Sequence, residues 1–194
     1  MALVLGLGNP GARYAQTRHN VGWRVLERLV RRWDARPAGE DVAWRAWRAE
    51  RPGGPVDLVV PLTFMNASGE AVEAWRERHG LEPAELLVLV DDVYLPVGIL
   101  RLRATGSGGG HHGLESIERV VGPDFARLRV GVGAAGSAAE LREHVLDEFE
   151  EDEKSAVDEA LEQAADAAEC WLAEGLLAAM NRFNRRIPKE ESES

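Results

Sequence analysis

The chain has 194 residues, 45% of them hydrophobic, so it can bury the core of one domain without disulfides. Its single cysteine, Cys170, excludes an internal disulfide framework and is typical of a reducing compartment. The formal net charge of -10 argues against a surface that attracts nucleic acid everywhere. Neither a secretory signal nor an apolar run of the roughly 20 residues that a membrane span needs is found. We therefore expect a cytoplasmic protein with no membrane partner.

In the first 80 residues the hydrophobic pattern alternates between strand and helix signals. Continuous apolar runs and two-residue alternation indicate strands, whereas apolar residues at intervals of three and four indicate helices. On these criteria we expect a strand over 2–7, a helix over 25–33, strands over 42–49 and 56–60, and a helix over 68–79. Ser68 is expected to be the N-cap of the last helix, which Gly80 ends.

The remainder of the chain continues the alternation. We expect a buried strand over 86–90, a strand over 99–103, a short helix near 114–121 after a glycine loop, a strand over 126–132, a short helix from about 138 and a long helix ending near 186. This order predicts one three-layer α/β domain over 1–188, with a twisted, mixed and largely parallel sheet flanked by helices. The charged tail over 189–194 is expected to be disordered.

A glycine motif follows the first predicted strand. Gly6, Gly8 and Gly11 match the G-x-G-x-x-G pattern of dinucleotide-binding folds. In those folds a helix begins inside the motif, so that its N-terminus meets the pyrophosphate. Here Pro10 and a mostly polar stretch precede the helical pattern, and the acidic residue expected about 20 positions later is missing. A nicotinamide-dependent oxidoreductase is thus a weak alternative, and the loop is better explained as one that presents Asn9 at a site.

Six short motifs occur in a fixed order along nearly the whole chain. They lie at 8–11 (Gly-Asn-Pro-Gly), 14–27, 63–69 (Thr-Phe-Met-Asn-Ala-Ser-Gly), 91–96, 110–114 and 127–133. Together they resemble the motifs of bacterial-type peptidyl-tRNA hydrolases. The resemblance implies an esterase that releases peptide from the 3′ end of tRNA, with peptidyl-tRNA as its partner and no cofactor. It also implies a monomer without an obligate protein partner.

The resemblance assigns roles that suit the chemistry of the residue types. His19 is expected to be the general base, because an unperturbed imidazole titrates at about pH 6.5. Asp91 is expected to orient it and to stabilise the imidazolium. Asn9 and Asn66 are expected to hold the water and substrate and to stabilise the oxyanion. The resemblance also implies contacts with substrate or tRNA from Tyr14, Met65, Asn66, Gly110, His111, His112, Arg101, Arg103 and Arg129.

Two positions depart from the family pattern. After His111 the family usually has an asparagine and, three residues further on, a basic residue, whereas this chain has His112 and Glu115. These departures bring the binding of tRNA into question. They are also the only support for an alternative function, that of a non-catalytic RNA-binding relative of the same fold. Adjacent histidines are poorly placed to chelate one ion, and we expect no metal.

Arginines are expected to supply the local positive charge that the net charge lacks. Binding responds to the field within about 8–10 Å at physiological salt, so a few well-placed cations suffice. The expected contributors are Arg18 beside His19, the strand pairs Arg101 with Arg103 and Arg127 with Arg129, and Arg182, Arg185 and Arg186 near the C-terminus.

Overall fold

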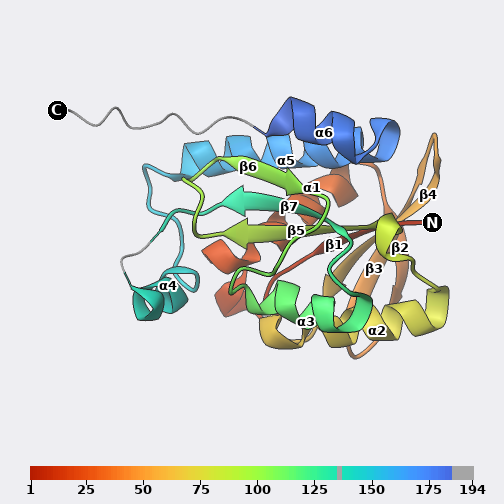
Figure 1. Cartoon of the computed structure of the whole chain (residues 1–194), viewed down its shortest axis with the longest axis horizontal. Helices are drawn as coiled ribbons and strands as arrows, with labels where there is room; N and C mark the ends of the chain where they lie inside the picture. The colour runs from red at the N-terminus through yellow and green to blue at the C-terminus, as the bar shows by residue number, and fades with distance from the viewer. Residues whose placement is uncertain (135–136, 185–194) are drawn as a thin grey trace.

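The computed structural model describes residues 1–134 and 137–184, which form a mixed sheet between two helical layers (Figure 1). The strands are β1 (Ala2–Gly6), β2 (Arg36–Glu40), β3 (Trp44–Arg51), β4 (Gly54–Pro61), β5 (Leu86–Asp92), β6 (Leu100–Arg103) and β7 (Ala126–Gly131). The helices are α1 (Val21–Arg32), α2 (Ser68–His79), α3 (His112–Val121), α4 (Ala138–His144), α5 (Lys154–Glu174) and α6 (Leu176–Phe183). The expected three-layer α/β architecture is confirmed.

The sheet is parallel in its centre and antiparallel at its edges. Its seven strands follow the order β2-β3-β4-β1-β5-β7-β6. β1 pairs in parallel with β4 and β5, and β5 pairs in parallel with β7. At the edges, β3 pairs antiparallel with β4, and β6 pairs antiparallel with β7. Parallel strands covered on both faces need continuous apolar runs, which β1 and β5 have. The carboxyl ends of four parallel strands therefore meet at one edge, where open α/β sheets bind their ligands.

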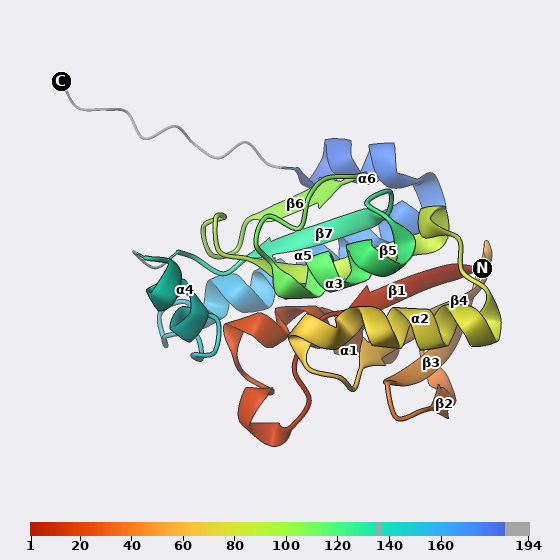
Figure 2. The ribbon, with the colours of Figure 1, turned by 60° about the horizontal axis from the view of Figure 1, so that its bottom comes forward.

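Helices cover both faces of the sheet (Figure 2). On one face α1, α5 and α6 bury a core that includes Val25, Leu29 and Leu161. On the other face α2 and α3 bury a second core around Trp75, Ile117 and Phe125. The short helix α4 lies beyond the sheet, at the edge where the parallel strands end. No helix within residues 1–134 and 137–184 combines the length and apolar character that crossing a membrane requires.

Several predicted helix boundaries were wrong, among them the start of α1, which lies at Val21 rather than at 25. The long C-terminal helix is interrupted at Gly175, whose φ of 88° is in the left-handed region that favours glycine, so α5 ends and α6 begins there. Ser68 is the first residue of α2 rather than its N-cap. Its hydroxyl donates to the carbonyl of Met65 at 2.8 Å, and Ala67 takes the cap position. The predicted helix end near 186 and the tail 189–194 lie outside the described residues.

Strand β2 was not predicted. All five of its residues, from Arg36 to Glu40, are exposed, so it shows no alternation of buried and exposed positions. It pairs antiparallel with β3 at the edge of the sheet, with a register shift between Pro37 and Gly39. Main-chain pairing with β3 and the ion pair between Glu40 and Arg45 hold it, and hydrophobic periodicity detects neither.

The contact between α1 and the sheet depends on a glycine near the predicted base. Gly22 lies so close to β5 that a methyl group in place of its hydrogen would clash with the carbonyl oxygen of Leu89. His19 lies three residues before Gly22, in the 3-10 helix η2 (Arg18–Asn20) that leads into α1. The close packing of α1 therefore fixes where His19 stands relative to the end of β5.

Gly22→Ala should lower the free energy of unfolding by about 1–3 kcal/mol, because the core must shift to admit the methyl group. The matched control is Gly53→Ala in the β3–β4 turn, where an added Cβ meets nothing within 4 Å. Urea denaturation of both variants measures the difference. Equal stability of Gly22→Ala and Gly53→Ala would show that α1 does not need this close approach.

Candidate active site

A cavity of about 530 Å³ opens at the edge where the parallel strands end. Loops after β1, β4 and β5, the glycine loop before α3, and the segment of α4 all contribute to its wall. Its lining includes the predicted residues Asn9, His19, Met65, Asn66, Asp91, Gly110, His111, His112 and Arg129. The structure thus gathers at one place most of the residues that the motifs indicated.

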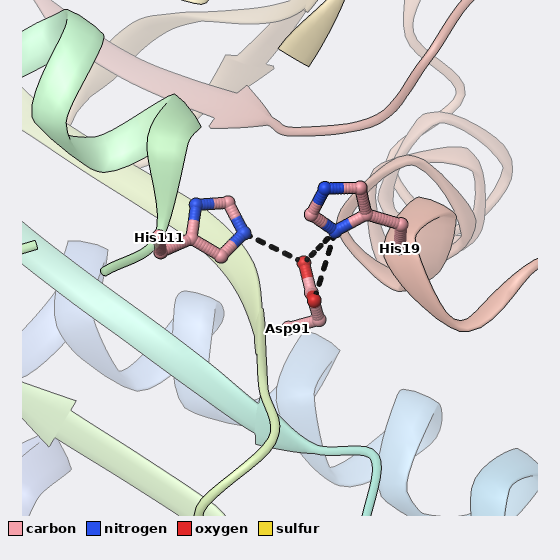
Figure 3. A group of neighbouring side chains, drawn as sticks. All are labelled: His19, Asp91 and His111. Atoms are coloured by element: carbon pink, nitrogen blue, oxygen red, sulfur yellow. Dashed lines mark hydrogen bonds and ion pairs between the residues drawn. The ribbon is translucent and has the colours of Figure 1, made fainter. Parts of the chain in front are cut away.

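Asp91 lies between two imidazole rings at the inner wall of the cavity (Figure 3). His19 Nδ1 is 2.9 Å from each carboxylate oxygen, and His111 Nε2 is 2.9 Å from Oδ1. The Asp91 side chain is 1% exposed, so these imidazoles replace the water it has lost. The sequence indicated the pairing of His19 with Asp91 but not that of His111.

The second hydrogen bond of His111 determines which of its nitrogens carries the proton. His111 is the N-cap of α3, and its Nδ1 accepts from the N–H groups of Gly113 and Leu114 at 3.2 and 3.4 Å. A neutral imidazole has one N–H, so Nε2 is the donor to Asp91. His19 in turn donates from Nδ1, which leaves its Nε2 with a lone pair and no partner among the described residues.

This network shifts the pKa values of both catalytic candidates. Burial alone would raise the pKa of Asp91, but the positive charge that His19 and His111 carry when protonated, together with their hydrogen bonds, outweighs it and lowers that pKa. Burial alone would lower the pKa of His19, but the charge and hydrogen bond of Asp91 raise it above its ordinary value of 6.5. Asp91 is therefore ionised, and His19 is a stronger base than a free imidazole.

The same three side chains could be considered as metal ligands. One atom each from His19, Asp91 and His111 lies within 4.8 Å of the others. A metal at His111 would need the lone pair of Nε2, while Nδ1 already accepts from backbone N–H groups. Both lone pairs would then be used and the ring would have to lose its proton. The donor set fits a hydrogen-bonded network better than an ion.

Asn9 is held rigidly by its neighbours. Its Oδ1 accepts from the Met65 N–H at 2.9 Å, so its Nδ2 is the group left to donate. Its own backbone N–H and C=O both bond to the side chain of buried Asn20, at 2.8 and 3.0 Å. Sequence patterns do not single out Asn20 as a site residue, although it lies within the motif at 14–27. Asn66, in contrast, is exposed on the cavity wall, and its amide has no partner among the described residues.

Three predicted contact residues do not line the cavity. Tyr14 lies in the 3-10 helix η1 (Ala12–Tyr14), where its hydroxyl accepts from Arg13. Arg101 and Arg103 lie on the edge strand β6, with Arg103 exposed and neither paired with a described carboxylate. Glu115 also lies off the cavity, in contact with the glycine loop at Gly108.

Part of the expected positive field is neutralised inside the protein. Arg18 is buried, donates to the carbonyl of Val132 and pairs with Glu153 at 2.6 Å. Arg127 is fully buried and pairs with Glu118. Arg182 pairs with Glu174, and positions 185 and 186 lie outside the described residues. The expectation that Arg18 and Arg127 contribute to a basic surface was therefore wrong, because both serve as internal hydrogen-bond donors.

Part of the cavity lining is apolar, a feature that the sequence did not reveal. The exposed side chains of Phe64, Tyr94 and Leu146 contribute to it, together with Leu141 and Val145. The backbone N–H of His19 donates to the carbonyl of Val145 at 2.8 Å, which places one of these apolar residues beside the base. The cavity lining thus combines amides and imidazoles with apolar side chains.

Comparison with known proteins agrees with the geometry. A family model described as peptidyl-tRNA hydrolase matches residues 3–192. Peptidyl-tRNA hydrolase of Synechococcus sp. (strain JA-3-3Ab) is 45% identical over 187 residues, 95% of this chain and 83% of the relative. That of Roseiflexus castenholzii is 44% identical over 193 residues, 98% and 90% of the two chains. The crystal structure of peptidyl-tRNA hydrolase from Acinetobacter baumannii, 34% identical, superposes with a TM-score of 0.89 over 95% of this chain and 94% of that chain.

Asp91→Asn should lower the pKa of His19, because the substitution removes the charge that raises it and leaves the burial that lowers it. An NMR titration of the imidazole signals measures this shift. His79, which stacks on Trp75 away from the cavity, is an internal control whose titration should not move. An unchanged His19 pKa would mean that the pair does not interact as the geometry indicates.

Proposed function

Because this chain belongs to the peptidyl-tRNA hydrolase family, and hydrolysis of peptidyl-tRNA is the reaction of that family, we propose that His19 is the general base of the reaction. The observation that carries the proposal is the orientation of His19. Its Nδ1 is held by a buried, ionised carboxylate, and its Nε2 is left as an acceptor on the wall of the cavity. This is the arrangement that a histidine needs in order to remove a proton from water.

In the proposed reaction, Nε2 of His19 takes a proton from a water molecule as the water oxygen attacks the ester carbonyl carbon. The resulting imidazolium is stabilised by Asp91. The tetrahedral intermediate then expels the ribose oxygen, which takes the proton back from His19. The products are a peptide with a free carboxyl group and a tRNA with a free 3′-terminal hydroxyl.

Asn9 and Asn66 are proposed to stabilise the oxyanion and position the water. Asn9 suits the oxyanion, because its Nδ2 is a fixed donor whose orientation is set by the bond from Met65 N–H to Oδ1. A preorganised donor of this kind contributes about 3–4 kcal/mol to transition-state stabilisation. Asn66 is exposed and unpaired among the described residues, so it can turn to bind either ribose or water.

The mixed lining of the cavity suits a substrate with an apolar and a polar half. The apolar residues Tyr94 and Leu146 are proposed to contact the peptide, and the loop around Gly110 and His112 the terminal nucleotide. Beyond the cavity, Arg101 and Arg103 are proposed to meet phosphates of the tRNA, because Arg103 is exposed and neither has a carboxylate partner among the described residues. Tyr14 stays a prediction of the family resemblance; among the described residues its ring and hydroxyl interact with Arg13.

The departures at 112 and 115 do not favour the alternative of a non-catalytic relative. His112 is exposed on the cavity wall and leaves the bonds among His19, Asp91 and His111 intact. Glu115 lies off the cavity and so adds no negative charge to its wall. We also propose that the protein acts as a monomer, as the family resemblance implies, and that it works in the cytoplasm, the kind of reducing compartment that its single cysteine favours.

His19→Ala should reduce kcat for N-acetyl-aminoacyl-tRNA by at least about 100-fold, because it removes the base while leaving the core unchanged. In the wild type, kcat/KM should fall as the pH drops through the raised pKa of His19, above 6.5, because the protonated imidazole cannot accept a proton. The control is His79→Ala on the exposed end of α2. Retention of more than a tenth of the wild-type kcat by His19→Ala would refute the assignment of the base.

Arg101→Ala with Arg103→Ala should raise KM for N-acetyl-aminoacyl-tRNA and reduce its salt dependence by about one unit of slope for each phosphate that is no longer bound. An N-acetyl-aminoacyl-adenosine, which lacks those phosphates, should be cleaved as before. The double variant Arg31→Ala with Arg36→Ala removes the same charge from exposed positions elsewhere and should leave KM unchanged. An equal reduction of activity on both substrates would show that β6 supports the fold instead.

A further inference from the structure

The loop that carries His111 is built from residues that favour disorder. Of its five residues from Gly106 to Gly110, four are glycine. Gly106, Gly109 and Gly110 have φ values of 136°, 64° and 83°, which side chains rarely adopt. Holding a glycine backbone in one conformation costs more entropy than holding any other residue. The loop ends at His111, whose ring bonds to Asp91. The bond between His111 and Asp91 therefore requires contacts that hold the loop in one conformation.

Two arginines of β7 bond to three successive carbonyl groups of this loop. Arg127 donates to the carbonyl of Gly106, and Arg129 Nη2 donates to the carbonyls of Ser107 and Gly108 at 3.1 and 3.4 Å. The carbonyl of Gly108 in turn accepts from the N–H of His111 at 3.2 Å. A continuous series of hydrogen bonds therefore connects β7, through the carbonyl groups of the loop, to the backbone of His111.

Arg129 also reaches the other side of the site. Its Nη1 lies 3.2 Å from Oδ2 of Asp92, the residue that follows Asp91. Asp92 is itself fixed, because its Oδ1 accepts from the N–H of Tyr94 at 2.8 Å. One guanidinium thus bridges the end of β5, which carries Asp91, and the loop that carries His111.

We infer that Arg129 is a positioning residue, which holds the glycine loop against the end of β5 and so sets the hydrogen bond between His111 and Asp91. The inference rests on the proposed function and assigns Arg129 a task other than the tRNA contact that family resemblance implies. Both of its Nη atoms already have acceptors, and its side chain is only 14% exposed. Arg127, fully buried and paired with Glu118, anchors the start of the loop.

The bridge requires an arginine. A guanidinium is planar and presents donors in several directions, so it can bond to a carboxylate and to carbonyls on the opposite side at once. A lysine at position 129 would keep the charge that attracts a phosphate but could not hold the same set of acceptors. The chemistry of the side chain therefore separates a positioning role from a phosphate-binding role.

Arg129→Lys should lower kcat by about 10- to 100-fold on both N-acetyl-aminoacyl-tRNA and N-acetyl-aminoacyl-adenosine, because the network around the base is displaced. KM for the adenosine substrate should change little. The acid limb of kcat/KM should also move to higher pH, because Asp91, no longer shared with His111, raises the pKa of His19 further. Arg31→Lys, the same substitution at an exposed position on α1, is the matched control and should leave kcat on both substrates unchanged.

Asp92→Asn tests the same bridge without changing the arginine, and it should lower kcat on the adenosine substrate as well. Circular dichroism and thermal unfolding check that each variant is folded. Wild-type kcat and pH profile for Arg129→Lys or for Asp92→Asn on the adenosine substrate would overturn the inference. If the wild type itself cleaved neither substrate, the proposed function would fail instead, which distinguishes the two.

Discussion

The site depends on one buried carboxylate shared by two imidazoles. Asp91 ends a central strand, and burial alone would favour its neutral form. It remains ionised because His19 donates to it from η2, just before α1 on one face of the sheet, and His111 donates to it from the start of α3 on the other face. The interaction that makes His19 basic therefore also joins the two helical layers where the parallel strands end.

Rigidity at this site comes from polar contacts between loops. Asn20 holds both backbone groups of Asn9, and the arginines of β7 hold the glycine loop before His111. Glycine allows the backbone to approach closely, as at Gly22 against β5, but it does not fix a loop. Buried hydrogen bonds to side chains supply the order that these segments lack on their own.

Sequence patterns predicted what depends on periodicity and motif. β5 was predictable because its buried residues form one continuous apolar run, and α2 because Gly80 marks its end. β2 was not predictable, since all its residues are exposed. Motifs singled out Asn9, His19, Asn66 and Asp91, and the fold places all four at one cavity. Pairing between distant charges has no local pattern, so the burial of Arg18 and Arg127 and the bond from His111 to Asp91 emerged only from the fold.

The most direct test of the account is the rate of ester cleavage by Asp91→Asn at a pH well above the His19 titration. There His19 is neutral in both proteins, so any difference reports only how well the imidazolium is oriented and stabilised. The account predicts that kcat remains lower than that of the wild type by on the order of 10²- to 10⁴-fold, because an amide cannot stabilise that charge. A kcat that recovers to the wild-type value at high pH would contradict it, since Asp91 would then affect only the pKa of His19.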